Sequence, residues 1–228
     1  DEKQAAAAVG QISLSHAWKE TLNSFKINSA QILLAPDDTE TRRKHINAKA
    51  TLDKLLHLNV IPVINENDTV STQEIKYGDN DRLAARVAQM VSADLLLLFS
   101  DIDGLYSSDP FKNKKSRFIK IIDSITSEIE KMGGPANSFI SSGGMVTKIE
   151  AAKIATNSGC EVIISNGKIN NPVSHLTSHD AKGSWFKANK NPINSRKQWI
   201  SGALQVKGKI MIDNGAEEAI SKGKSILP

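Results

Sequence analysis

The chain alternates between short apolar runs and longer stretches in which apolar residues recur at helical spacing. The apolar runs have the length of strands and occupy residues 30–35, 60–64, 94–99 and 161–165. The stretches with helical spacing occupy residues 37–59, 80–91 and 146–156. Strands that alternate with helices form parallel βαβ units with right-handed crossovers. The pattern therefore predicts an α/β fold with a largely parallel sheet.

Further elements are predicted at both ends of this repeating region. Residues 1–25 have the pattern of a helix, residues 118–122 that of a short strand, residues 124–132 that of a helix, and residues 209–212 and 214–221 those of a strand and a helix. Asp37 or Asp38 is expected to cap the helix at 37–59, and Asp79 or Asn80 the helix at 80–91.

Polar side chains are concentrated between the strand at 60–64 and the helix at 80–91. This segment, residues 63–81, contains two clusters of amides and carboxylates: Asn65, Glu66, Asn67, Asp68, Asn80 and Asp81. A loop at the carboxyl end of a strand is where an open α/β sheet binds its ligands. Asn, Asp and Gly also form ordinary turns, but two adjacent clusters contain more hydrogen-bonding groups than turns require. The segment therefore predicts a site for a small polar substrate.

Glycines precede the predicted helix at 146–156, in the run Ser142, Gly143, Gly144, Met145, Val146, Thr147, Lys148. Such glycines let backbone N–H groups approach an anion, while the helix dipole and Lys148 add positive charge. The spacing is not that of a P-loop, so it does not predict an ordinary nucleoside triphosphatase. A glycine hinge beside a surface lysine explains the same residues, and spacing alone does not choose between the two interpretations.

A second candidate loop begins at Ser100 and Asp101, directly after the strand at 94–99. It starts like a calcium-binding loop, but the later acidic ligands and the closing glutamate are missing, which argues against calcium. Either a turn that holds a nucleotide or a plain strand-to-helix turn remains. The position at the edge of the sheet favours the nucleotide.

Composition narrows the class of protein. The 228 residues carry a formal net charge of +4, which suits anionic ligands but is too small to indicate nucleic-acid binding. The most basic run, residues 112–120, is expected to be a solvated loop. The single cysteine, Cys160, is expected to pack as a small hydrophobe. The histidines are too scattered to predict a metal site. No apolar run is long enough for a bilayer, and we expect a cytoplasmic protein without membrane association.

Together these motifs resemble the amino-acid kinase family, and in particular its glutamate-phosphorylating members. The resemblance covers essentially the whole chain and rests on residues 4–11, 61–68, 74–81, 100–110, 142–148, 196–199 and the tail from Gly208. It implies a three-layer α/β/α sandwich with a mainly parallel sheet. It also implies transfer of phosphate from ATP, with Mg²⁺, to the γ-carboxylate of L-glutamate, the first step of proline biosynthesis, with feedback inhibition by proline.

The resemblance assigns roles to residues on both sides of this reaction. Asp68 and Asn80 correspond to glutamate-binding residues, and Asn65 lines the same pocket. Lys148 corresponds to the lysine that neutralises charge on the transferring phosphoryl group, and Asp81 to the aspartate that orients catalytic lysines. Such roles agree with phosphoryl transfer, which depends on alignment and charge stabilisation.

The ATP-binding segments follow from the same resemblance. They are Ser100 and Asp101, together with Ser142, Gly143, Gly144, Met145, Val146, Thr147 and Lys148.

The chain departs from the family at its two ends. Family members begin with a strand bearing a Lys-x-Gly-Ser/Thr motif, followed by a Ser-Gly-Ala loop, and both would lie upstream of Asp1. The tail resembles only the opening of a PUA module, an RNA-binding type of fold. We therefore expect a truncated kinase domain at residues 1–200, a linker at 201–207 and the start of a PUA-like domain at 208–228, in a fragment that is inactive alone.

The implied partners are L-glutamate, ATP, proline as inhibitor, further copies in a homo-oligomer, and glutamate-5-semialdehyde dehydrogenase, the next enzyme of the pathway. Two alternatives stay open. One is another amino-acid kinase, acting on aspartate, N-acetylglutamate or UMP. The other is a non-catalytic fragment that binds RNA through its tail and basic segments.

Overall fold

The computed structural model describes residues 2–70, 80–134, 144–178, 181–189, 211–221 and 223. Its helices are α1 (Glu2–Ser24), α2 (Pro36–Glu40), α3 (Arg42–His57), α4 (Asn80–Val91), α5 (Ser127–Met132), α6 (Met145–Asn157), α7 (Pro172–Leu176) and α9 (Asn214–Ser221). Its strands are β1 (Ser29–Leu34), β2 (Ile61–Glu66), β3 (Leu95–Ser100), β4 (Leu105–Tyr106), β5 (Phe118–Ile119), β6 (Ile121–Ile122), β7 (Glu161–Asn166) and β8 (Ser184–Phe186). The four apolar runs are strands and the three intervening stretches are helical, as predicted.

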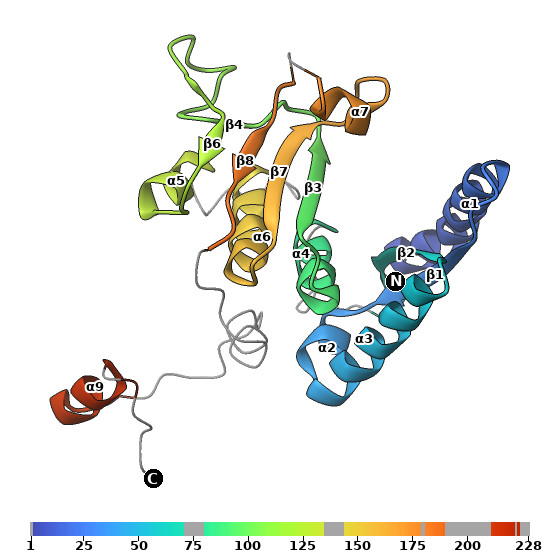
Figure 1. Cartoon of the computed structure of the whole chain (residues 1–228), viewed down its shortest axis with the longest axis horizontal. Helices are drawn as coiled ribbons and strands as arrows, with labels where there is room; N and C mark the ends of the chain where they lie inside the picture. The colour runs from blue at the N-terminus through green and yellow to red at the C-terminus, as the bar shows by residue number, and fades with distance from the viewer. Residues whose placement is uncertain are drawn as a thin grey trace.

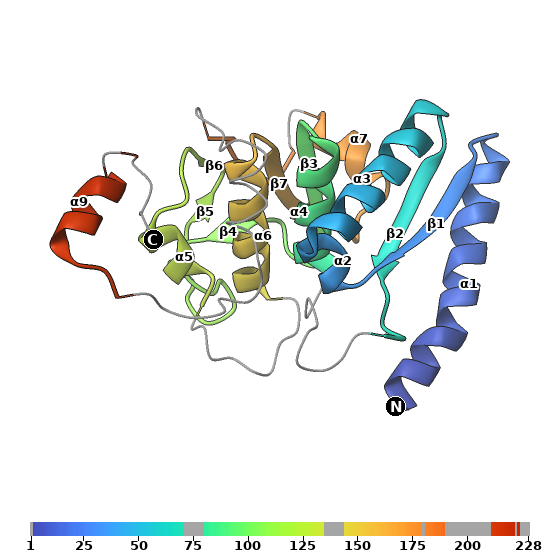
Figure 2. The same ribbon diagram turned by 90° about the horizontal axis from the view of Figure 1, so that it is seen from below.

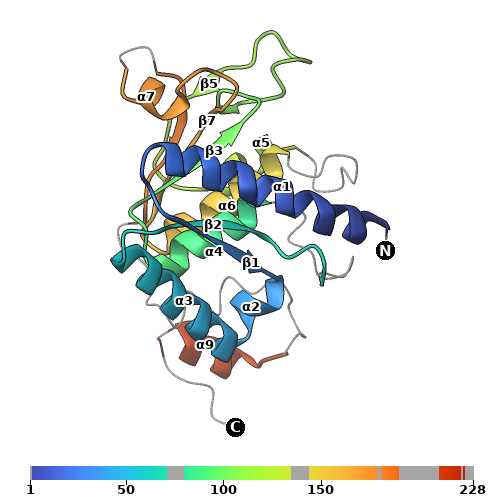
Figure 3. The same ribbon diagram turned by 90° about the vertical axis from the view of Figure 1, so that its right-hand side faces the viewer.

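The amino-terminal part of the chain is a local three-layer unit. β1 and β2 pair in parallel, from Ser29 opposite Ile61 to Leu34 opposite Glu66. The pair lies between α1, which contacts β1, and α3, which contacts β2 (Figure 3). A connection through a helix between parallel strands is the predicted βαβ unit.

The second sheet has the strand order β3-β7-β8-β6. β3 pairs with β7 in parallel and β6 with β8 in parallel, whereas β7 and β8 are antiparallel. The helices α4 and α6 lie side by side against this sheet (Figures 1 and 2). Alternation along the strands directs Leu98, Val162 and Ile164 into the core beneath the helices. On the opposite face Leu95 and Trp185 remain exposed.

Small side chains line the contact between α4 and α6. Ala85 on α4 and Ala151, Ala152 and Ala155 on α6 are fully buried, and such residues let two helix backbones approach closely. Cys160 lies in the same core and is 1% exposed. Burial raises the pKa of its thiol to about 11, and the prediction that Cys160 packs as a small hydrophobe is confirmed by its place in the core.

β2 and β3 both contact α4, yet neither sheet contains the other's strand. An apolar cavity of about 350 Å³ separates them. Its lining comes from both strands and from α4, and includes Pro62, Ile64, Leu83, Val87, Leu95 and Leu96.

The single helix predicted at 37–59 is wrong in its first turns. The chain forms α2 and then restarts as α3 after Thr41, which is extended. Neither Asp37 nor Asp38 is the N-cap. Pro36 opens α2 directly after β1, and Asp38 in its first turn accepts a hydrogen bond from the Ala35 N–H at 2.8 Å. Asp37 instead accepts from Thr41 Oγ1 at 2.6 Å, at the break.

Two strand boundaries also differ from prediction. β2 runs two residues further than 60–64, because its parallel pairing with β1 continues to Glu66, so Asn65 and Glu66 belong to the strand rather than to the loop. The predicted strand at 118–122 is split at Lys120. There the chain leaves β4, the antiparallel partner of β5, and β6 pairs with β8 instead.

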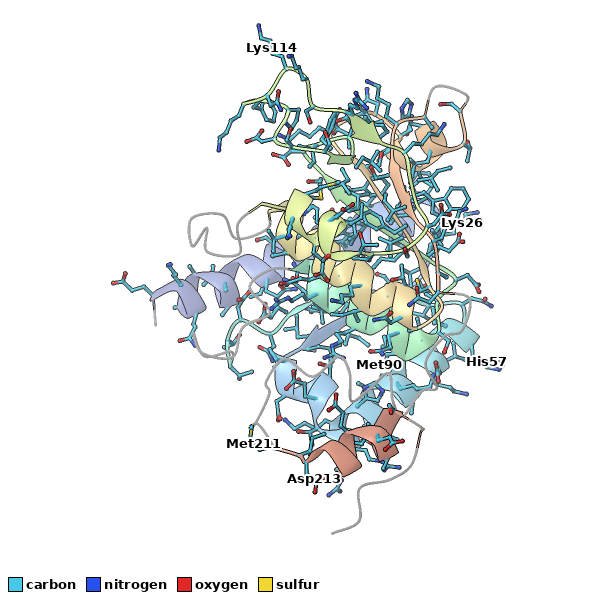
Figure 4. The ribbon with its side chains drawn as sticks, turned by 90° about the vertical axis from the view of Figure 1, so that its left-hand side faces the viewer. Lys26, His57, Met90, Lys114, Met211 and Asp213 are labelled. Carbon is cyan, nitrogen blue, oxygen red and sulfur yellow. The ribbon has the colours of Figure 1, made fainter. Side chains whose placement is uncertain are left out.

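The remaining loops and helix caps follow the predictions in part. Asn80 is the first residue of α4 and not its cap, and Asp79 lies outside the described residues. The loop from Ser100 leads to β4, so it is not a strand-to-helix turn. The basic run at 112–120 is largely exposed, and Lys114 points away from the body of the molecule (Figure 4). The expected solvated loop is therefore confirmed for residues 112–117, whereas Phe118 and Ile119 form the half-buried strand β5.

The tail is described only in part. The predicted helix at 214–221 is α9, which lies apart from both sheets (Figure 1). Of the predicted strand at 209–212, residues 209–210 lie outside the described residues, and Met211 and Ile212 have no strand structure. The domain boundaries and the PUA-like module stay predictions. Across the described ranges, no helix combines the length and the apolarity needed to cross a membrane.

Candidate functional site

The first turns of α4 and α6 meet in an ion pair. Lys148 Nζ donates to Asp81 Oδ2 at 2.7 Å, and the side chains are only 8% and 15% exposed. Thr147 Oγ1 lies 3.3 Å from the same carboxylate oxygen and donates to the Gly144 carbonyl at 2.8 Å. The structure thus brings Thr147 and Lys148 to Asp81, which precedes them in the sequence by 66 and 67 positions.

The electrostatics of this junction favour an anion. Gly144 is the N-cap of α6, and Lys148 stands in the first turn, where a cation opposes the helix dipole. Asp81 offsets this cost and stands in the first turn of α4, where a carboxylate is favourable. Two positive helix ends and one ammonium thus share one carboxylate, and the excess positive charge suits a phosphate group. Ser142 and Gly143 lie outside the described residues.

A relay of amides adjoins this junction. Asn80 Nδ2 donates to Asn65 Oδ1 at 2.9 Å, and Asn65 Nδ2 donates to Gln11 Oε1 at 2.9 Å. The relay joins α4, β2 and α1, and Asn80 is the neighbour of Asp81 in the chain. Asn65 and Asn80 are therefore in direct contact, as a shared pocket requires. Gln11 lies in residues 4–11, one of the segments that carry the resemblance, but no role was predicted for it, because a single glutamine on a helix gives no signal of its own.

Asp68 lies just beyond β2, and it shares a cleft with Gln11, the last residue of the amide relay. Both residues line a small cleft with Glu66 and Thr69, between the end of β2 and α1. Glu66 is 8% exposed. The cleft places carboxylates beside the amide relay, which is a suitable setting for an ammonium group.

A cavity of about 430 Å³ lies near the two predicted nucleotide-binding segments, and of the predicted residues that the structure describes Met145 lines it, whereas Ser100 and Asp101 do not. Ile102 and Gly104, which follow the pair Ser100 and Asp101, line one side, and Met145 at the start of α6 lines another. Ser100 ends β3, and its hydroxyl donates to Asp101 at 3.1 Å. Further lining comes from the β4–β5 connection and from the end of α5, and includes Tyr106, Pro110, Phe111 and Met132. Apolar walls with backbone groups suit a nucleobase.

The loop beside this cavity is held by specific contacts. Gly104 has φ +149°, and a Cβ there would lie 2.4 Å from Ser184 Oγ, so only glycine fits. That hydroxyl accepts from the Leu105 N–H at 2.7 Å and donates to the Ile119 carbonyl at 2.6 Å. Tyr106 donates to Asp103, and burial, followed by this carboxylate, raises the pKa of the phenol. The mouth of the cavity is thereby fixed relative to β8.

A second ion pair joins α4 to α6 beside the first. Arg82 Nε donates to Glu150 Oε2 at 2.9 Å, and Nη2 contacts the same oxygen. These two residues were not predicted as part of a site, because charged residues on amphipathic helices are usually solvated. Their meeting depends on how the two helices pack.

Residues 1–166 match the family model described as the amino acid kinase family. The chain belongs to the amino acid kinase family. All 228 residues align, at 54% identity, with 58% of a glutamate 5-kinase from Rhizobium johnstonii. At 55% identity they also align with 58% of a glutamate 5-kinase from Sinorhizobium fredii. The chain thus spans less than two thirds of the length of these curated relatives.

Solved structures support the kinase-family fold. X-ray structures of isopentenyl phosphate kinase superpose with a TM-score of 0.53, over 77% of this chain and 66% of the other, at 16% identity. At that identity the likeness concerns the fold alone. It agrees with the predicted α/β class and its mainly parallel sheet.

Proposed function

We propose that the protein from which this chain comes phosphorylates the γ-carboxylate of L-glutamate at the expense of ATP. The observation that carries the proposal is the Asp81–Lys148 pair at the start of α6, next to the Asn65–Asn80 contact. The start of α6, which suits an anion, and the amides, which suit a polar substrate, are thus adjacent, because their partners Asp81 and Asn80 are neighbours on α4. The relatives named glutamate 5-kinase, which are 54–55% identical over the whole chain, support this choice of substrate.

The site residues divide the work between them. Asn65, Asn80 and Asp68 bind glutamate, since amides and a carboxylate complement its carboxylate and ammonium groups. ATP extends from the 430 Å³ cavity, beside Ser100 and Asp101, to the first turn of α6. There the N–H groups and Lys148 stabilise the charge on the phosphoryl group during transfer.

In the reaction, a γ-carboxylate oxygen of glutamate attacks the terminal phosphorus of ATP, and the bond from that phosphorus to the bridging oxygen of ADP breaks. The attacking carboxylate is already ionised at neutral pH, so no protein group needs to remove a proton. Lys148, oriented by Asp81, stabilises the negative charge that develops on the phosphoryl group and on the departing ADP. The protein contributes alignment and electrostatic stabilisation rather than a covalent intermediate.

Mg²⁺ would accompany ATP and neutralise phosphate charge. Within the described ranges, no group of three or more His, Cys, Asp or Glu side chains forms a metal site. This fits an ion held mainly by phosphate oxygens and water, which is how Mg²⁺ commonly binds with nucleotides.

The finer features of the proposal go beyond this site. They are a place at the first step of proline biosynthesis, inhibition by proline, self-association, cooperation with glutamate-5-semialdehyde dehydrogenase, and a cytoplasmic location. RNA binding through a PUA-like tail is a further prediction. Each rests on the family resemblance.

The test uses the gene product expressed at full length. It is incubated with ATP, Mg²⁺, L-glutamate and hydroxylamine, and glutamyl hydroxamate is measured, with ATP-free and glutamate-free reactions as controls. We expect hydroxamate only in the complete reaction. Parallel reactions with aspartate, N-acetylglutamate and UMP are followed by ADP release, because phosphorylated UMP forms no hydroxamate, and they give little product if glutamate is the substrate. Faster transfer to one of these, or no transfer at all, would refute the proposal.

A further inference from the structure

The position of Lys148 depends on how α6 packs against α4. Fully buried alanines, among them Ala85, Ala151 and Ala152, form a seam in this contact, and Ile149 of α6 is buried in the same core cluster. Alanines allow close approach, but they lack the bulky side chains that interlock and resist rotation or sliding of one helix on the other. Contacts beside these alanines therefore help to set the height of α6, and with it the position of Lys148.

The Arg82–Glu150 pair is placed to do this. Arg82 follows Asp81 on α4, and Glu150 lies two residues after Lys148 on α6, so a second bridge flanks the first. Both the Nε and the Nη2 of Arg82 contact one carboxylate oxygen. Because the guanidinium is planar and rigid, two such contacts restrict orientation as well as distance.

The Arg82–Glu150 pair contributes little to the stability of the fold. The side chains of Arg82 and Glu150 are 29% and 42% exposed, so water screens their attraction and the contribution to stability is modest. Their value lies in geometry. A bridge from the first turn of α4 to the second turn of α6 constrains the angle between the two helices, and with it the direction in which the Lys148 ammonium points.

We propose that the Arg82–Glu150 pair is a positioning device that sets α6 relative to α4 and holds the Lys148 ammonium in line with the transferring phosphoryl group. The inference rests on the proposed function. Neither residue needs to touch substrate. Displacement of a catalytic group by about 1 Å can lower a rate about 100-fold, so a small shift of α6 is sufficient for a large effect.

The kinetic test compares variants of the full-length protein. For Arg82→Met we expect kcat to fall about 10- to 100-fold, with the KM for glutamate within about twofold of the wild type. Arg82→Lys keeps the charge but loses the planar double contact, and it should recover part of the loss. The matched control is Lys153→Met, which breaks an ion pair from the same helix to Glu130, on the side of α5. It should leave kcat unchanged.

A second readout does not depend on activity. The reactivity of Lys148 toward acetic anhydride, measured by mass spectrometry relative to the exposed Lys112, reports how well the ammonium is held. It should rise several-fold in Arg82→Met and stay constant in Lys153→Met. If the wild type phosphorylates no glutamate but Lys148 reactivity still rises, the proposed function fails and the positioning role stands.

The inference is overturned if folded Arg82→Met retains the kcat and the Lys148 reactivity of the wild type. It is equally overturned if Lys153→Met loses as much activity. Should Arg82→Met fail to fold, Glu150→Gln takes its place, because it keeps an acceptor oxygen at a partly exposed position. kcat must then also fall in Glu150→Gln, although by less than expected for Arg82→Met. If it does not fall, the inference is wrong.

Discussion

The two halves of the candidate site are built from different materials. At the start of α6, a buried ammonium and a carboxylate join two helices that pack through an alanine seam. Around Asn65, neutral amides join α1, β2 and α4, and the bond from Asn80 is exposed. The first half holds one charge in one place, whereas the second offers donors and acceptors that adapt to a ligand.

This difference has consequences for mutation. Removing one partner of a buried ion pair costs about 3–5 kcal/mol, because the remaining charge stays desolvated. A neutral hydrogen bond contributes about 1 kcal/mol, and water can replace it at an exposed site. Changes at the helix junction should therefore impair turnover and the fold, while changes in the amide region should impair glutamate binding.

Lys148→Ala should have the largest effect. It removes the cation that meets the developing charge, so kcat should fall about 100- to 1,000-fold, with little change in the KM for glutamate. Steady-state kinetics of the full-length protein measure both. A rise in KM at constant kcat would make Lys148 a ground-state anchor.

Asp81→Asn should rank next. The amide keeps the shape but leaves the Lys148 ammonium without its buried carboxylate, so we expect a loss of about 3 kcal/mol in the free energy of unfolding. Because Lys148 also loses its orientation, kcat should fall about 50-fold. Urea denaturation and turnover test the two parts. Unchanged stability would contradict the structural role of the pair.

Asp68→Ala should act mainly on binding. Loss of a charge-assisted hydrogen bond to the ammonium group of glutamate should raise the KM about 20-fold, with kcat nearly constant. Unchanged glutamate saturation would exclude Asp68 from the pocket.

Gln11→Ala should have the smallest effect. It removes one neutral partner of Asn65, so the KM for glutamate should rise about fivefold without a change in kcat. The matched control is Gln31→Ala on β1, which also removes a side-chain amide, from a contact with Ser15. Equal effects of the two changes would show that the relay has no special role.

The sequence predicts regular elements well where periodicity is strong. The strand at 94–99 and the helix at 80–91 are apolar or amphipathic throughout, and the structure places β3 and α4 there within a residue. Elements that depend on a partner strand were harder to predict. The extension of β2 through Asn65 and Glu66 follows from pairing with β1, and the split at Lys120 follows from a choice between β4 and β8.

The same distinction applies to the site. Asp81, Asn65 and Lys148 stand in short polar motifs that are visible in the sequence. In the structure Asp81 contacts Lys148, and Asn65 contacts Asn80, the neighbour of Asp81. Gln11 and the Arg82–Glu150 pair could not be predicted in this way. Their importance comes from tertiary packing, because an isolated charge or amide on a helix surface looks the same whether or not a second helix lies against it.

The most direct test of this account compares glutamate saturation curves for the wild type, Lys148→Ala and Asp68→Ala, measured together in the hydroxamate assay. The account predicts opposite patterns: Lys148→Ala lowers kcat and leaves KM nearly unchanged, and Asp68→Ala raises KM and leaves kcat nearly unchanged. If both substitutions change the same parameter, the site is not divided between phosphoryl transfer and substrate binding as proposed.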